Sequence, residues 1–230
     1  MKIIFLGHGG FRFEIGKEVL LVDPFLTGNP VFPAERYEEA IEGVTAIFVT
    51  HGHGDHTSDA YQIAKAKGVK LYCIADLAGY WGKAGEIDCV GFNKGGTIRL
   101  DGVAVTMVMA THSSSLPTEN GPVYVGTESG FILEGEGHSI YFSGDTDVMA
   151  DMKIFHDLHK PDIGILCAGG HYTMDMKRAA YAAKTFFEFK TVIPMHYKTF
   201  PGLEQSAEVL VAELPGVDVI EPEVLTALEF

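Results

Sequence analysis

Three histidines and one aspartate fall within six consecutive residues of this chain, in the stretch His51-Gly52-His53-Gly54-Asp55-His56. Imidazole nitrogen and carboxylate oxygen are common protein ligands for zinc and related divalent metals. The two interleaved glycines leave the backbone free to fold tightly, so alternate side chains can converge on one point. A His-rich tag would lie at a terminus and would carry no interleaved Gly and Asp. The stretch therefore predicts a metal site.

Further candidate ligands occur at the ends of other apolar segments. The run Ala46–Val49 is typical of a buried strand, so the His-rich stretch begins where a strand gives way to a loop. His112 follows a similar run, and His196 follows the segment Thr191–Pro194. Asp145 stands among small residues, as close approach to an ion requires. Taken alone, each histidine is most simply a polar residue at the rim of a sheet, and Asp145 could cap a following helix.

The pattern His51-x-His53-x-Asp55-His56 resembles the H-x-H-x-D-H signature of the metallo-β-lactamase superfamily, whose members hold two metal ions. Three other motifs narrow the resemblance: Leu6-Gly7-His8, Val22-Asp23-Pro24-Phe25 and Gly169–Met174. They look like the branch of small metal-dependent hydrolases that includes L-ascorbate 6-phosphate lactonase. The resemblance covers essentially the whole chain. It implies an α/β fold, the αββα four-layer sandwich, with the metal site at one edge between two halves.

The same resemblance implies two divalent metal ions per chain and seven ligands. These are His51, His53 and His112 for one ion, Asp55, His56 and His196 for the other, and Asp145 as the bridge between them. Five imidazoles among seven ligands suit zinc without excluding others, so we expect zinc or manganese first and iron as a further option. Asp23 would support the metal loop from behind, although a turn-forming role is the simpler alternative.

A binuclear site of this kind predicts a hydrolase. A hydroxide between two divalent ions is a nucleophile at neutral pH, because even one zinc ion lowers the pKa of a bound water to about 7. It would attack an ester, lactone or phosphodiester of a small molecule, and Asp55 could orient it as well as bind metal. The candidate substrate contacts are His8, His171 and Tyr197. His171 is also the candidate catalytic acid for the leaving oxygen, and each of the three has an ordinary alternative as a polar loop residue.

Charge and ligand pattern weigh against three rival functions. The net charge is −14, and residues 116–230 carry 7 basic and 18 acidic residues, so a nuclease is disfavoured because this surface repels nucleic acid. A diiron electron-transfer module of the superfamily has a carboxylate where His53 stands. A non-catalytic scaffold would not need a complete ligand set. A small substrate, including an anionic one, can still be attracted to two metal ions, which carry the largest local charge.

We expect residues 1–230 to form a single domain with halves of about 1–115 and 127–230. The polar loop Ser113–Thr127 is the candidate junction and the candidate flap over the site. Strands alternate with helices, as in α/β proteins. The strands expected are Ile3–Leu6, Phe11–Ile15, Val19–Val22, Val44–Val49, Lys70–Ala75, Thr97–Leu100, Val103–Ala110, Phe131–Glu134, Ser139–Phe142, Ile163–Leu166, Thr191–Pro194 and Asp218–Ile220. The helices expected are Ala34–Glu42, Ser58–Lys67 with a cap at Thr57 or Ser58, Asp76–Lys83, Val148–His159, Asp175–Glu188 and Leu203–Glu213.

Composition gives the expected setting of the protein. No apolar run approaches the ~20 residues needed to cross a bilayer. The three cysteines, Cys73, Cys89 and Cys167, are too few and too scattered for a disulfide framework. We therefore expect a cytoplasmic protein that has a small-molecule substrate and no nucleic-acid or membrane partner. A homo-oligomer is compatible with this interpretation.

Overall fold

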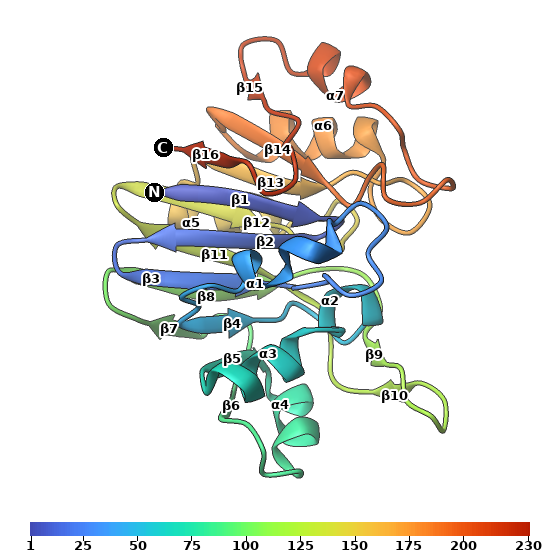
Figure 1. Cartoon of the computed structure of the whole chain (residues 1–230). Helices are drawn as coiled ribbons and strands as arrows, with labels where there is room; N and C mark the ends of the chain where they lie inside the picture. The colour runs from blue at the N-terminus through green and yellow to red at the C-terminus, as the bar shows by residue number, and fades with distance from the viewer.

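Two seven-stranded β-sheets lie face to face in the computed structural model, which describes residues 1–230 (Figure 1). The strands of the first sheet are β1 (Lys2–Gly7), β2 (Gly10–Ile15), β3 (Glu18–Val22), β4 (Ala46–Phe48), β5 (Lys70–Ile74), β6 (Cys89–Phe92) and β16 (Ala227–Glu229). Those of the second are β7 (Thr97–Arg99), β8 (Val103–Met109), β11 (Ser129–Gly135), β12 (His138–Phe142), β13 (Ile163–Cys167), β14 (Thr191–Met195) and β15 (Asp218–Val219). The strand orders are β16-β1-β2-β3-β4-β5-β6 and β15-β14-β13-β12-β11-β8-β7.

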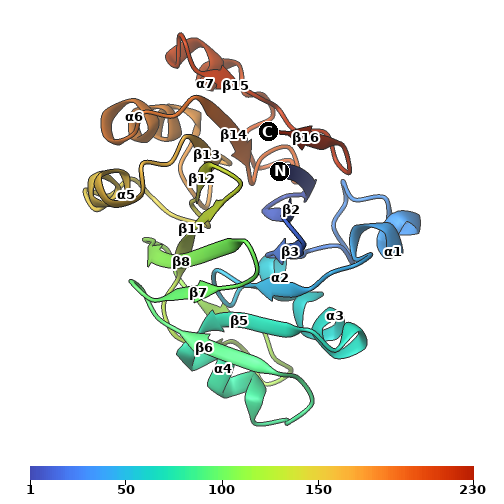
Figure 2. The same ribbon diagram turned by 90° about the vertical axis from the view of Figure 1, so that its left-hand side faces the viewer.

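Helices cover the outer faces of both sheets. Their bounds are η1 (Ala34–Arg36), α1 (Tyr37–Ala40), α2 (Gly54–Thr57), α3 (Ala60–Lys67), α4 (Ala75–Gly82), α5 (Met152–His159), α6 (Met176–Phe186) and α7 (Glu208–Glu213). Figure 2 shows α5 and α6 outside the second sheet and α1 and α3 outside the first. The αββα sandwich that we expected is therefore present. No helix combines the length and the apolar character needed to span a membrane.

The core lies between the sheets and follows from the alternation of side chains along each strand. In β2, Phe11 and Phe13 are fully buried, whereas Arg12 between them is half-buried. The two phenylalanine rings meet the Phe142 ring of β12 across the sandwich, with centroids 5.8 and 6.3 Å apart. These spacings are typical of edge-to-face aromatic pairs. A single cluster of 61 buried apolar residues runs through both sheets, so they share one core.

The chain passes from the first sheet to the second at an earlier point than we expected. We had placed this boundary in the loop Ser113–Thr127. The chain crosses to the second sheet after β6, so β7 and β8 belong there and not with the first half. The reason is the long antiparallel pairing of β8 with β11, from Val103↔Gly135 to Met109↔Ser129. The loop Ser113–Thr127 instead forms a small hairpin of β9 (Ser115–Leu116) and β10 (Val123–Tyr124).

Local details also differ from the sequence-based expectations. Neither Thr57 nor Ser58 caps the helix after the His-rich stretch, since Thr57 belongs to α2 and α3 begins after Asp59. The Thr57 hydroxyl donates to the His53 carbonyl oxygen, 2.9 Å away. Strands β6 and β16 were not expected. β16 pairs antiparallel with β1, with Ile3 opposite Leu228, and so covers an edge that would otherwise be open.

Candidate metal centre

The candidate ligands meet at one edge of the sandwich, where several strands end. This edge is where open α/β sheets place their ligand sites. Each candidate lies just beyond the carboxyl end of a strand or in the short helix α2 that follows one. The residues are His8 after β1, His51, His53, Asp55 and His56 after β4, His112 after β8, Asp145 after β12, and His196 after β14.

One group consists of His51, His53 and His112. Their ligand atoms lie within 4.8 Å of one another. His51 Nε2 is 3.0 Å from His53 Nδ1. His51 is fully buried, whereas the other two are partly exposed. The three imidazoles that we expected to hold one ion are thus brought together by the fold.

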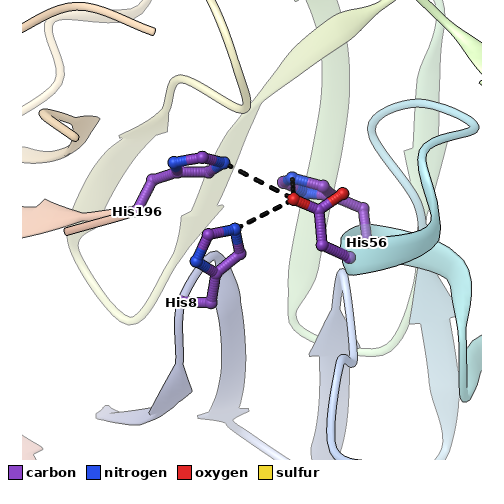
Figure 3. Close-up of side chains that lie close together, drawn as sticks. His8, His56 and His196 are labelled. Carbon is purple, nitrogen blue, oxygen red and sulfur yellow. Dashed lines mark hydrogen bonds and ion pairs between the residues drawn. The ribbon is translucent and has the colours of Figure 1, made fainter. Parts of the chain in front are cut away.

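A second group consists of His8, Asp55, His56 and His196, whose ligand atoms also lie within 4.8 Å of one another. Asp55 Oδ2 is 3.0 Å from His8 Nε2, 3.7 Å from His196 Nε2 and 4.0 Å from His56 Nε2. Figure 3 shows the three labelled rings arranged around one carboxylate. The last three members are the expected ligands of the other ion. His8, which we expected to contact substrate, lies among them.

Asp145 lies between the two groups. Its Oδ2 atom is 3.1 Å from His196 Nε2, 3.4 Å from His56 Nε2, 3.6 Å from His112 Nε2 and 4.0 Å from His51 Nε2. The next helix, α5, begins only at Met152, so Asp145 does not cap it. This carboxylate therefore lies within 4.0 Å of two imidazoles from each group, His51 and His112 from the first and His56 and His196 from the second.

Buried ligand atoms without hydrogen-bond partners show that a cation fits this centre. These atoms are His56 Nε2, His196 Nε2 and Asp145 Oδ1. Buried polar atoms in folded proteins are nearly always paired, and an unpaired one costs about 1–3 kcal/mol. Divalent ions at the two groups would give these atoms the partner they lack.

Asp23 is not one of the expected ligands but contacts the His-rich stretch and Thr50 before it. Its side chain is fully buried at the end of β3. Oδ1 accepts a hydrogen bond from the Thr50 backbone N–H at 2.8 Å, and Oδ2 accepts one from the Thr50 hydroxyl at 2.5 Å. Oδ2 also lies 2.8 Å from His56 Nδ1. A neutral imidazole that donates a hydrogen bond from one ring N–H to a carboxylate has a lone pair on its other nitrogen that can bind a metal.

The backbone is strained at three of these residues. His8, Asp23 and His196 have φ values of 57°, 50° and 63°, in the left-handed region that non-glycine residues rarely adopt. Such strain costs of order 1–3 kcal/mol per residue and is kept where the surrounding structure enforces it. Here His196 N–H donates to the His8 carbonyl oxygen at 2.8 Å. A Cβ on Gly169 would lie 2.0 Å from the His196 carbonyl oxygen, so the chain needs glycine there to pass the loop that carries His196.

The charges of the metal-free centre hold protons on two of the imidazoles. Burial lowers the pKa of His196, but the negative charge of Asp145 and the proximity of both Asp145 and Asp55 outweigh it and raise the pKa to about 9. Burial also lowers the pKa of His56, yet the nearby carboxylates raise it well above its usual value. For His8, burial dominates and lowers the pKa to about 4.

The apparent affinity for divalent metal should therefore rise with pH from about 6.5 toward 9, because His56 and His196 must lose their protons to bind an ion. Each proton released adds up to about a tenfold gain in affinity per pH unit. Titration calorimetry in buffers of different ionisation enthalpy measures the protons released per ion. An affinity that does not change over this range, with no proton release, would contradict the assigned protonation.

A cavity of about 370 Å³ opens directly onto the centre, a size suited to a small molecule. Its walls are formed by His53, Asp55, His112, Ser113, Asp145, Tyr172 and His196. We did not anticipate two of these residues. Ser113 brings its Oγ to 3.3 Å from His53 Nε2, and Tyr172 is 65% exposed at the cavity wall. The only sequence signal for Tyr172 was its place in the motif Gly169–Met174.

Two expected substrate contacts lie elsewhere. His171 lines a neighbouring cavity together with Gly170 and Glu204, and its ring meets that of Tyr172 at a centroid distance of 4.5 Å. Tyr197 is buried, and its hydroxyl donates to Glu221 at 3.1 Å. Neither side chain lines the cavity at the centre.

The sequence of this chain matches a known family model and the sequences of known proteins. Residues 19–197 match the model of the beta-lactamase superfamily domain. A protein of Dinoroseobacter shibae named UPF0173 metal-dependent hydrolase is 61% identical over 229 residues, which cover 100% of both chains. A protein of the same family name from Ruegeria pomeroyi is 56% identical with the same coverage.

Solved structures agree with this grouping. Igni18, described as a novel metallo hydrolase from the archaeon Ignicoccus hospitalis, superposes with a TM-score of 0.83 at 31% identity, over 100% of this chain and 98% of Igni18. An isothiocyanate hydrolase from Delia radicum gut bacteria superposes with a TM-score of 0.74 at 18% identity, over 100% of this chain and 99% of the other. The second likeness concerns the fold alone.

Proposed function

This chain belongs to the beta-lactamase superfamily and, within it, to the UPF0173 metal-dependent hydrolases, and from that premise we propose that it hydrolyses an ester, lactone or phosphodiester of a small molecule at a binuclear metal centre. The observation that carries the proposal is the position of Asp145, within 4.0 Å of imidazoles from both ligand groups. A carboxylate in that position can serve two ions at once.

The proposed ligands divide as the two groups do. His51, His53 and His112 would hold one ion, Asp55, His56 and His196 the other, and Asp145 would contact both. Zinc or manganese suits this mixture of imidazoles and carboxylates, and iron is a further option. When bound, two such ions polarise a carbonyl or phosphoryl oxygen and supply a water of lowered pKa, about 7 in the case of zinc.

The chain's own residues would orient the reactants. The Asp55 side chain is 33% exposed and lines the cavity, while Oδ2 lies 3.0 Å from His8. One carboxylate group can therefore bind an ion and also accept a hydrogen bond from the attacking water. The buried side of the centre, with His51, His56 and Asp145 almost inaccessible to solvent, restricts water to the cavity face.

Tyr172 is the side chain that we propose as a substrate contact in this cavity. It is exposed and stands at the wall of the cavity. We assign His171 a supporting role, because its ring contacts the Tyr172 ring and lines only the neighbouring cavity. The substrate would be a small molecule, anionic or neutral, and we propose neither a nucleic-acid nor a membrane partner for a surface of net charge −14.

We expect Tyr172→Ala to raise KM more than His171→Ala does. A catalytic acid contributes about 10²–10⁴ in rate, so His171→Ala should slow turnover by less than about a hundredfold if the residue only positions Tyr172. Steady-state kinetics on a confirmed substrate, with the metal content of each variant measured, separates the two cases. If the His171→Ala variant with its full metal content turned over substrate about a thousandfold more slowly than the wild-type protein, this result would support His171 as the catalytic acid.

Metal analysis followed by a substrate panel tests the function. The purified protein, reconstituted with zinc or with manganese, should contain close to two ions per chain. It should then be assayed against lactones, thioesters, small phosphodiesters and a single-stranded oligonucleotide. Turnover of a small molecule that stops with a chelator supports the proposal. A stoichiometry of one or none after reconstitution, or turnover of the oligonucleotide alone, overturns it.

A further inference from the structure

The surroundings of His8 are those of a metal ligand. The residue is 1% exposed, and its ring packs between the rings of Phe25, Phe200 and His196, with centroid distances of 5.9, 5.4 and 3.9 Å. Its Nε2 atom lies 3.0 Å from Asp55 Oδ2, in the group that also contains His56 and His196 (Figure 3). The ring is therefore fixed with one nitrogen aimed into the centre.

The other ring nitrogen has a partner that can select the tautomer needed for metal binding. His8 Nδ1 lies 3.0 Å from the hydroxyl oxygen of Thr199. That hydroxyl has one hydrogen and donates it to the carbonyl oxygen of Tyr197, 3.2 Å away, which can only accept. With its hydrogen so placed, Thr199 accepts a hydrogen bond from His8 Nδ1–H, and this is the tautomer that frees Nε2 for an ion. In the neutral ring, Nε2 is left with a lone pair that faces the lone pairs of Asp55 Oδ2, and a cation between them resolves this repulsion.

We propose that His8 is an eighth ligand of the centre and binds, through Nε2, the ion held by Asp55, His56 and His196, with Thr199 fixing the tautomer. The inference rests on the metal-binding part of the proposed function and not on the bond that is hydrolysed. A ligand histidine usually donates its other ring N–H to a nearby oxygen, and Thr199 fills that role.

The turn after β1 is built to place His8 there. His8 itself adopts the left-handed backbone, with φ of 57°, and Gly7 before it has φ of 92°. A Cβ on Gly9 would lie 2.9 Å from His56 Cε1, so only glycine lets the turn pass the His56 ring. The turn therefore holds His8 against a residue of the same ligand group.

With His8 as an eighth ligand, the two ions would have different numbers of ligands. One ion would have three imidazoles and Asp145, a set of four that suits tetrahedral zinc. The other would have His8, Asp55, His56, His196 and Asp145, a set of five that suits a metal accepting five or six ligands, such as manganese. The ion at the His8 position should therefore favour Mn²⁺ more than the other ion does.

The first test is the binding of Mn²⁺ alone to the metal-free full-length protein, followed by the electron paramagnetic resonance signal of free Mn²⁺. His8→Asn is the variant of choice, because asparagine tolerates the left-handed backbone. One of the two ions should bind at least about a hundredfold more weakly and the other should be unchanged, and Thr199→Val should weaken the same ion about 10–100-fold. Lys160→Asn, at another left-handed position with φ of 46°, serves as the control and should bind both ions normally.

The second test is a crystal structure of the Mn²⁺-loaded wild-type protein, which remains decisive even if His8→Asn fails to fold. A separation of about 2.0–2.3 Å between His8 Nε2 and the ion supports the proposal. A separation beyond about 3 Å, or wild-type affinity for both ions in folded His8→Asn, overturns it while leaving the binuclear function intact. Failure of the wild-type protein to bind any ion overturns both.

Discussion

Asp145→Ala should release both ions and lower kcat/KM at least about a thousandfold, more than any other single ligand change. The carboxylate lies within 4.0 Å of imidazoles in both groups, so its loss would remove a ligand from each of the two proposed ions and the group that would set their separation. Metal ions contribute several kcal/mol to the stabilisation of transition-state charge, and each 1.36 kcal/mol corresponds to about a factor of ten in rate. Metal content after dialysis and steady-state kinetics measure the two effects.

His112→Ala is the matched control for Asp145→Ala. His112 belongs to one ligand group only and is partly exposed, so its loss should weaken one ion and leave the other in place. Asp145→Asn separates charge from shape, because the amide keeps the size of the carboxylate but cannot serve two cations as an anion does. Retention of both ions by Asp145→Ala at wild-type affinity would refute the bridging assignment.

The sequence alone indicated the candidate metal ligands best where they are close together in the chain. The stretch from His51 to His56 packs four ligand candidates into six residues, and two glycines within it allow them to converge. His112, Asp145 and His196 could be identified only with the resemblance to a known family, because their distances to one another depend on the pairing of strands that are far apart in the sequence.

Contacts between distant segments explain what the sequence could not predict. The place of His8 depends on Thr199, 191 residues away, and on the packing of His196 against its ring. Tyr197 turns away from the cavity because Glu221, in the segment after β15, accepts its hydroxyl hydrogen. Strand β16 is short and only partly apolar, and its pairing with β1 is decided by an open sheet edge, which no local pattern reports.

Asp23→Asn should weaken binding of the ion proposed at His56 about 10–100-fold and destabilise the metal-free protein by about 3–5 kcal/mol. The two oxygens of Asp23 face three donors: the Thr50 N–H, the Thr50 hydroxyl and His56 Nδ1. An amide offers one oxygen and places an NH₂ group against a donor, so His56 loses its orienting partner and a buried charge pair is broken. The backbone at position 23 has φ of 50°, which asparagine tolerates, so the variant tests the side chain alone.

Asp59→Asn is the control that separates loss of stability from loss of metal. Asp59 is also buried, and its side chain accepts hydrogen bonds from Leu26 N–H, Thr27 N–H and the Thr27 hydroxyl, but it contacts no candidate ligand. Both variants should unfold at lower denaturant concentration, and only Asp23→Asn should also bind metal more weakly. If Asp23→Asn loses stability yet keeps wild-type affinity for both ions, then Asp23 is only part of the core and His56 needs no carboxylate behind it.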